Sequence, residues 1–248
     1  MIKIKHFFFL SFLFLYVGNA AAQCGFGKAE KINENWKFIL KDLPEAKEDN
    51  FNDERWQRVD LPHDWSIRQP LSPTHASCMG YLPGGIGWYR KNMPIPAEKS
   101  GEKVYLYFEG IYNRSEVYLN GHLLGKRPNG YISFLYDATP YIKYGQDNVV
   151  AVRVDHSRAA DSRWYTGSGI YRNVWLVYAN PVHIAEWGVY AYPSEANAKK
   201  GTLQVEVEVT NGGENTENLT VVNELFDDQG KIVTVRKNKL SIAAGENS

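Results

Sequence analysis

The sequence is poor in the residues that mark disulfide-rich and metal-binding proteins. It contains two cysteines, Cys24 and Cys78, which could pair in an oxidising compartment but cannot make a disulfide framework. It has no Cys-x-x-Cys, no His-Glu-x-x-His and no clustered His/Cys spacing of the kind that binds zinc. His63 and Asp64 are adjacent on a proline-containing loop, which is a poor arrangement for a metal pair. We therefore expect no metal site and no cofactor.

An excess of charge is also lacking. Lys plus Arg and Asp plus Glu both number 28, so the formal net charge is zero. A chain without excess positive charge lacks the basic surface that binds nucleic acid, which excludes that class of partner. Nucleophile elbows, P-loops and Cys/His nucleophile pairs are missing too, so the sequence has no self-contained catalytic set and we assign no catalytic residue.

Long apolar runs are confined to the first residues. Two lysines precede the run "FFFLSFLFLYV", and small residues up to Ala22 offer a cleavage site. This order predicts a secretory signal peptide over residues 1–22 and a periplasmic or secreted protein. A lipoprotein would carry its acyl chain on Cys24, but Gln23 is too large and polar for that site. No later stretch approaches the roughly 20 apolar residues of a membrane helix, so we expect no membrane span.

Alternation with a period of two is the main pattern in the rest of the chain. In "NVVAVRVDH", Val150, Val152 and Val154 point one way and their neighbours the other. The segment "SEVYLNGHLLGK" predicts a hairpin with its turn at Asn120-Gly121, because Asn-Gly accepts positive φ at both turn positions. The segments "GWYRKNMPI", "VYLYFEG" and "NVWLVYAN" complete at least five strands between residues 85 and 180.

Helical patterns are short. One turn is expected in "FNDERWQRVDLP", with Asn52 as its cap, and another in "DATPYIKYG". Neither is long enough to organise a domain. Many short strands separated by Gly, Pro, Asn and Asp predict an all-β fold, a sandwich or jelly roll.

The composition changes near Asn180-Pro181, where aromatic residues become scarce and Glu, Asn, Thr and Val more frequent. "TLQVEVEV" alternates cleanly, which predicts Leu203, Val205, Val207 and Val209 as inward-facing residues. Residues 181–248 contain four or five predicted strands, whereas an immunoglobulin-like sandwich needs about seven. We therefore expect an incomplete sandwich belonging to the front part of a longer protein.

Two loops combine aromatic residues with glycine. "GYLPGGIGWYRK" (80–91) and "SRWYTGSGIYRNVWL" (162–176) suit a sugar, since aromatic faces stack on pyranose rings and polar side chains bind hydroxyls. The same residue types suit a tight interface with a neighbouring domain. Glu109 is the acidic residue that lies within an apolar strand, where it is either buried or paired with Arg114.

Four segments in order carry a resemblance to a known family. They are "WQRVDLPHDWSI", "GGIGWYRK", "VYLNGHLLGKRPNGYISFLYDATPYI" and "SRWYTGSGIYRNVWL". Together they resemble the N-terminal module of glycoside hydrolase family 2, especially its bacterial β-galactosidase-like members, over about residues 33–180. The resemblance implies a jelly-roll, galactose-binding-like β-sandwich over residues 23–180, followed by a truncated immunoglobulin-like sandwich over 181–248.

The resemblance also implies where catalysis occurs. In the family, a (β/α)8 barrel follows these domains and carries both catalytic glutamates of a retaining mechanism. No barrel sequence is present in these 248 residues, so the chain alone is expected to be inactive. Its expected partners are a β-galactoside-type carbohydrate and the barrel of the same protein.

The site residues implied by the resemblance lie on the two glycine-containing loops. Arg163 and Trp164 are expected to face the sugar pocket, with Asp161 next, although the position where some members have a sugar-binding Asp is Arg163 here. Gly84 and Gly85 would let the other loop lie close to the same pocket. Interdomain packing is expected for the residues that follow, Tyr171, Arg172 and Trp175.

The sequence thus predicts the N-terminal, sugar-binding part of an exo-glycosidase that hydrolyses terminal β-galactosides. Two alternatives remain open. One is a stand-alone carbohydrate-binding or adhesion module, and the other is the same family with β-glucuronidase or β-mannosidase specificity.

Overall fold

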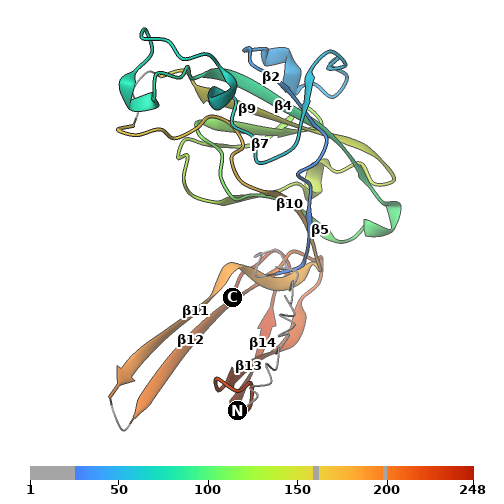
Figure 1. The fold of residues 1–248 in the computed structure, drawn as a ribbon. Coiled ribbons are helices and arrows are strands. Elements are labelled where there is room, and N and C mark those ends of the chain that lie inside the picture. Colours follow the sequence, from blue (N-terminus) through green and yellow to red (C-terminus); the bar gives the residue numbers. More distant parts are fainter. Residues whose placement is uncertain (1–25, 159–161, 198–199) are drawn as a thin grey trace, which may run out of the picture.

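The protein is all-β, and its first part is a sandwich of two antiparallel sheets (Figure 1). The computed structural model describes residues 26–158, 162–197 and 200–248. One sheet has four strands in the order β1 (Lys28–Lys31), β10 (Val174–Ala179), β5 (Lys103–Phe108) and β8 (Phe134–Asp137). The first strand therefore pairs with the last strand of this sandwich, as Lys28 lies opposite Tyr178.

The second sheet has six strands and carries the loops of interest at one end. Its order is β3 (Gln57–Val59), β2 (Trp36–Ile39), β4 (Gly85–Ile95), β9 (Gln146–His156), β6 (Ser115–Leu119) and β7 (His122–Arg127). Among the described residues, five 3₁₀ turns lie in the connections: η1 (Pro44–Lys47), η2 (Ser66–Arg68), η3 (Ser77–Met79), η4 (Ala97–Lys99) and η5 (Thr139–Tyr141).

The hydrophobic core lies between the two sheets. Val150, Val152 and Val154 are fully buried in it, which confirms the alternation predicted for this strand. The predicted hairpin is also confirmed, since β6 and β7 are joined at Asn120 and Gly121, whose φ angles are 50° and 83°. These positive φ angles are the reason for the Asn-Gly pair.

Both expected turns are present. "DATPYIKYG" contains the 3₁₀ helix η5. In "FNDERWQRVDLP" the Trp56 N–H donates to the Asp53 carbonyl at 3.1 Å and Asn52 Oδ1 accepts the Glu54 N–H at 3.0 Å, after which the chain enters strand β3. An Asn side chain bonded two residues ahead stabilises such a turn.

One buried arginine fixes a long segment over the outer face of the six-stranded sheet. Arg90, 2% exposed, donates to the backbone carbonyls of Ala46 and Glu48 at 2.5 and 2.8 Å and to Asp53 Oδ2 at 2.8 Å. Trp56, Trp88 and neighbouring apolar residues pack beneath this segment. A planar guanidinium with five donors can satisfy several carbonyls at once, which explains an arginine here.

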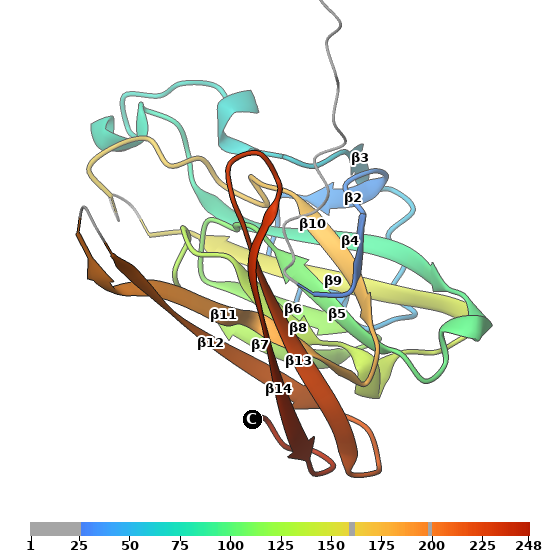
Figure 2. The same ribbon diagram turned by 90° about the horizontal axis from the view of Figure 1, so that it is seen from below.

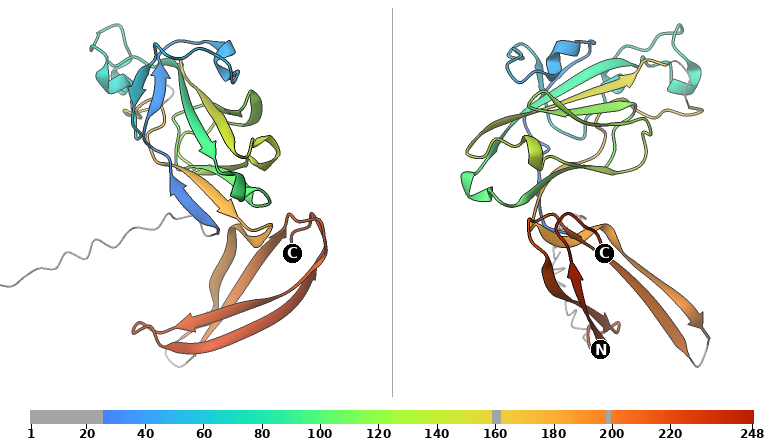
Figure 3. Two further views of the ribbon diagram at one scale, coloured as in Figure 1. Left: turned by 90° about the vertical axis from the view of Figure 1, so that its right-hand side faces the viewer. Right: turned by 180° about the vertical axis from the view of Figure 1, so that it is seen from behind.

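The described residues between 182 and 242 form two separate hairpins (Figures 2 and 3). One joins β11 (Val182–Ala196) to β12 (Gly201–Asn211), and the other joins β13 (Glu217–Phe226) to β14 (Ile232–Ile242). Among the described residues, these four strands make two-stranded sheets that do not join edge to edge.

The inward-facing residues predicted for β12 are only partly buried. Val209 is 3% exposed, but Leu203 and Val205 on the same face are 47% and 38% exposed, so the expectation of burial is wrong for these two. The alternation itself is correct. Burial fails because no strand among the described residues lies over the far end of this hairpin.

Aromatic rings connect the first sandwich to β11. Phe26 stacks on the His183 ring with centroids 5.0 Å apart, and Tyr105 approaches both rings edge-on. His183 Nδ1 lies 2.8 Å from the Asn180 carbonyl, so it carries the proton, and Nε2 accepts from the Tyr105 hydroxyl at 3.3 Å.

Within the described part of the chain, no helix is long and apolar enough to cross a bilayer.

Candidate functional site: three loops joined by Asp64

Three loops meet at one end of the six-stranded sheet. We call them the Asp64 loop (61–68), the glycine loop (80–85) and the aromatic loop (162–169). Asp64 Oδ1 accepts the backbone N–H groups of Ser66 and Ser168, both at 2.9 Å, and Asp64 Oδ2 accepts the hydroxyl of Tyr165. One carboxylate therefore satisfies donors from two loops. Burial and the bond to Asp64 raise the pKa of Tyr165 well above its usual value, so this phenol stays protonated.

A chain of hydroxyl groups connects the same loops. Ser66 Oγ lies 2.6 Å from the Pro83 carbonyl and 2.5 Å from Ser168 Oγ, which lies 2.6 Å from His156 Nδ1. A carbonyl only accepts, so the Ser66 hydroxyl donates to it and the Ser168 hydroxyl donates to Ser66. His156 Nδ1 must then carry a proton and donate to Ser168. The donor directions fix the tautomer of a buried histidine at the end of β9.

A second buried histidine, His63, belongs to the Asp64 loop itself. His63 Nδ1 lies 2.8 Å from the Tyr89 hydroxyl, and its ring packs edge-on against Phe38. Burial, together with the positive charge of Arg68, lowers the pKa of His63 to about 4. This side chain is therefore neutral at physiological pH and acts as packing and as a hydrogen-bond partner.

The glycines of these loops are required by contacts within the chain. A Cβ on Gly84 would collide with the carbonyl oxygen of His156, and one on Gly167 would lie 2.9 Å from Asp64 Oδ2. Gly169 has φ +119° and faces the Tyr89 hydroxyl. Small residues thus let the loops lie directly on one another.

A cavity of about 300 Å³ lies between the glycine loop and the end of β9. Its walls are Thr74, His75, Ala76, Met79, Leu82, Pro83, Gly84, Gly85, His156, Ser157 and Arg158. The lining combines apolar side chains with imidazole, hydroxyl and guanidinium groups. Its size is at the lower end for small-molecule sites.

Exposed aromatic side chains lie on both the aromatic loop and the glycine loop. Trp164 is 60% exposed and Tyr165 is 38% exposed on the aromatic loop, and Tyr81 is 48% exposed on the glycine loop. The two loops approach each other at Gly80, where a Cβ would lie 4.0 Å from the Tyr165 ring. Large exposed aromatics on loops held this firmly indicate a surface for binding.

The structure places four of the five predicted site residues in these loops. Gly84 and Gly85 line the cavity, while Arg163 and Trp164 lie exposed on the aromatic loop. Asp161 lies outside the described residues, as do the predicted signal peptide and Cys24. Cys78 is half-buried in η3.

Several residues of the site have no clear signal in the sequence. The sequence presents Asp64 only as half of a poor metal pair, and no motif marks Ser66, Ser168 or His156. The Asp-x-Ser spacing, typical of a side chain bonded two residues ahead, is a signal that points to Asp64. Within the described ranges, no group of three or more His, Cys, Asp or Glu could hold a metal ion.

Tyr171 and Trp175 bond to groups of the first sandwich, whereas Arg172 is exposed, and interdomain packing of these three residues stays a prediction. The Tyr171 hydroxyl donates to the Gly130 carbonyl at 2.7 Å. Trp175 Nε1 donates to Glu109 Oε1 at 2.7 Å, and Asn173 Nδ2 donates to both oxygens of Glu109. Glu109 is thus held by these neutral donors.

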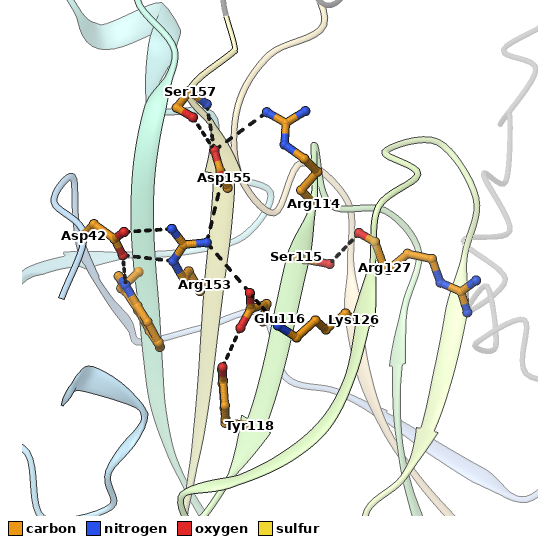
Figure 4. A network of polar contacts seen from close by, with 11 residues as sticks. Asp42, Arg114, Ser115, Glu116, Tyr118, Lys126, Arg127, Arg153, Asp155 and Ser157 are labelled. Carbon is orange, nitrogen blue, oxygen red and sulfur yellow. Dashed lines mark hydrogen bonds and ion pairs between the residues drawn. The ribbon is translucent and has the colours of Figure 1, made fainter. Parts of the chain in front are cut away.

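Most of the remaining charged residues of the sheet form a structural network on its outer face (Figure 4). Arg153 donates from Nε and Nη2 to the two oxygens of Asp42, at 2.9 and 2.7 Å. Glu116 and Asp155 flank the same guanidinium at 3.9 and 3.8 Å. Because the charges balance locally, we interpret this cluster as structural.

Comparisons with known proteins agree with this geometry. Residues 29–181 match the family model described as "Glycosyl hydrolases family 2, sugar binding domain". Among curated relatives, "Beta-galactosidase BoGH2A" of Bacteroides ovatus is 42% identical over 87% of this chain and 26% of its own length. A "Putative beta-glucuronidase" of Formosa agariphila is 37% identical over 86% of this chain and 20% of its own length. The chain thus spans about a quarter of the length of such relatives.

Solved structures have the same fold. A β-glycosidase from Bacteroides vulgatus superposes with a TM-score of 0.80 at 39% identity, covering 88% of this chain and 29% of the other. A β-glucuronidase from Bacteroides uniformis superposes with a TM-score of 0.82 over 89% of this chain and 26% of its own. Its 24% identity supports the fold alone.

Proposed function

Since this chain belongs to glycoside hydrolase family 2, as its sugar-binding domain, we propose that it forms the sugar-contacting front part of a retaining exo-glycosidase that removes terminal β-galactosyl residues. The observation that carries the proposal is the loop cluster described above. Trp164 and Tyr165 are exposed on the aromatic loop, Asp64 binds the Tyr165 hydroxyl, and the glycine loop borders a cavity of about 300 Å³. The β-galactosidase name of a 42% identical relative supports the choice of sugar.

Catalysis itself requires other residues. Retaining glycosidases use two carboxyl groups about 5 Å apart on either side of the sugar bond. We infer that a (β/α)8 barrel of the same protein supplies them. The three loops would then complete the wall of its pocket. Purified protein containing residues 23–248 is expected to leave p-nitrophenyl β-galactoside intact, and hydrolysis that survives repurification would refute this inference.

The binding role can be tested on the chain itself. Saturation-transfer NMR with methyl β-galactoside should show contact with the protein, and the Trp164→Ala variant should lose most of it while keeping its circular dichroism spectrum. Trp164 is exposed, so its removal leaves the core intact. Unchanged transfer in the variant would show that Trp164 does not touch the sugar.

A β-glucuronidase is the second candidate, because relatives with that name align with the chain and Arg158 lines the cavity. A guanidinium there would favour a uronate carboxylate. Stronger transfer from methyl β-glucuronide than from the galactoside, abolished by Arg158→Gln, would favour this specificity. A stand-alone adhesion module would instead bind long glycans through the same loops, with no need of a barrel.

We also propose export through the signal peptide at residues 1–22. Its basic start, apolar run and small residues at the cleavage position support this proposal. The intact mass of protein recovered from the periplasm or medium should correspond to a chain that begins at Gln23. A mass that includes residues 1–22 would contradict it.

A further inference from the structure

The outer face of the β11–β12 hairpin differs in chemistry from its inner face. The inner face is aliphatic, with Val189 opposite Val207 and Ala191 opposite Val205, and its Val209 is buried. The outer face presents aromatic and acidic or amide side chains in the same register. Tyr190 lies opposite Glu206 and Tyr192 opposite Gln204.

Aromatic side chains on this outer face are large and accessible. Trp187 is 65% exposed and Tyr190 is 60% exposed. The Tyr190 and Tyr192 rings lie 4.9 Å apart at an interplanar angle of 31°. A shallow hollow of about 280 Å³ is bordered by Trp187, Gly188, Tyr190, Glu206, Val207, Glu208 and Ser248. Two aromatic side chains and two carboxylates therefore border one concave surface, together with Val207 and Ser248.

A β-bulge aims Trp187 at this hollow. The register of β11 shifts between Ile184 and Val189, and Trp187 has φ 56°. The bulge is built around Gly188, where a Cβ would lie 2.8 Å from the backbone oxygens of both Ala185 and Glu208. Bulges redirect side chains, and a tryptophan with positive φ carries backbone strain that an unbulged strand would avoid.

The charge of this surface restricts its ligand. The Tyr192 hydroxyl donates to Glu206 at 3.2 Å, and Asn247 Nδ2 donates to Glu208 at 3.1 Å. Among the ion pairs of the described residues, none involves either glutamate. Both carboxylates are oriented by neutral donors and keep acceptor capacity for hydroxyl groups. Their uncompensated charge would repel uronate or sulfate groups.

We propose that the outer face of the β11–β12 hairpin is a second carbohydrate-binding surface, specific for neutral glycan chains. Trp187 and Tyr190 would stack on the apolar faces of pyranose rings, and Glu206 and Glu208 would accept hydrogen bonds from the hydroxyls. The proposal depends on the proposed function in one respect only, namely that the ligand is a carbohydrate. The surface belongs to a different sheet from the Asp64 loops and uses different aromatic residues.

The backbone of Trp187 offers a sharp test. Trp187→Gly removes the indole and also suits the positive φ, so the variant should be at least as stable as the parent. Native affinity electrophoresis of the full chain in gels containing β-1,4-galactan or xyloglucan measures binding. We expect the parent to be retarded, and Trp187→Gly and Tyr190→Ala to bind at least tenfold more weakly.

Three further measurements distinguish the alternatives. Trp164→Ala, at the loop cluster, should keep the binding due to the hairpin, and polygalacturonate should not retard any variant. Retardation that survives Trp187→Gly but is lost in Trp164→Ala would refute the hairpin site while supporting the loop site. No retardation by either neutral glycan, or equal retardation by polygalacturonate, would also refute it. Binding of a lysine-rich peptide alone, lost in Trp187→Gly, would identify a protein-docking face and overturn the proposal.

Discussion

Asp64 and Ser168 lie far apart in the sequence, yet the Asp64 carboxylate accepts the Ser168 backbone N–H at 2.9 Å. The same oxygen accepts the N–H of Ser66. A hydrogen bond to a charged group contributes about 1.5–3 kcal/mol, more than one between neutral groups. This contact therefore holds the aromatic loop, which carries the exposed Trp164, against the Asp64 loop.

Removal of the Asp64 carboxylate should destabilise the first sandwich. We expect Asp64→Ala to lower the free energy of unfolding by about 1–3 kcal/mol, because two backbone N–H groups lose their acceptor. Tyr165→Phe removes only the hydroxyl bond to the same carboxylate and should cost less than half as much. Urea denaturation of both variants measures the difference. Equal losses would mean that the backbone contacts contribute little.

Gly169 should tolerate no side chain. A Cβ there would meet Tyr89 and the His63 carbonyl, and φ is +119°. Gly169→Ala should cost about 3 kcal/mol or more, which combines overpacking with backbone strain. Gly101 is the matched control, since its φ is +95° but no atom lies within 4 Å of its Cβ position. Gly101→Ala should cost only about 1 kcal/mol in the same denaturation experiment. Similar losses of unfolding free energy in Gly169→Ala and Gly101→Ala would show that steric contact at Gly169 contributes little.

His63 should make stability depend on pH. Its pKa is about 4 in the folded protein, below the usual value of 6.5 that it regains on unfolding. As pH falls, His63 binds a proton in the unfolded chain before it does so in the folded protein. The free energy of unfolding therefore decreases as pH falls from about 6.5 towards 4. The slope for this one group is at most about 1.4 kcal/mol per pH unit.

The variant His63→Gln isolates that contribution, because glutamine keeps a hydrogen-bonding group but does not titrate here. We expect the stability advantage of the parent over this variant to shrink between pH 7 and pH 4.5. Unfolding free energies in urea at four pH values check this. An advantage that stays constant over the range would show that His63 titrates normally.

Arg153 should not be replaceable by lysine. Its Nε and Nη2 groups bond both oxygens of Asp42, which chiefly explains why the pKa of Asp42 is lowered. An ammonium group cannot make this two-point contact. Arg153→Lys should lower the free energy of unfolding by about 1 kcal/mol. Lys126→Met removes an exposed ion pair with Glu116 and should change it by less than about 0.5 kcal/mol. A larger loss of stability in Lys126→Met than in Arg153→Lys, measured by thermal denaturation, would contradict this prediction.

The strands of the first sandwich could be predicted well from the sequence. Alternation at Val150, Val152 and Val154 and the Asn120-Gly121 turn are local signals, and the structure follows both. Four motifs in order also identified the family. The short strands β1 and β2 gave no comparable pattern, because they have only four residues each.

The Asp64 clamp could not be predicted in the same way. Its defining bond joins residues that are 104 positions apart, and periodicity carries no information about such a pair. The exposed Leu203 and Val205 illustrate a second limit. Alternation predicts which face of a strand is apolar, whereas burial depends on whether another layer covers that face.

The pairing of β1 with β10 has a consequence for synthesis of the chain. Lys28 is made early, but its partner Tyr178 emerges only after every other strand of the first sandwich. Until then β1 has no partner strand, and the edge of β5 that pairs with β10 is open. The two later hairpins, in contrast, pair residues close in sequence and can form as they are made. Any expression fragment intended to fold as the first sandwich should therefore extend from residue 26 to at least residue 179.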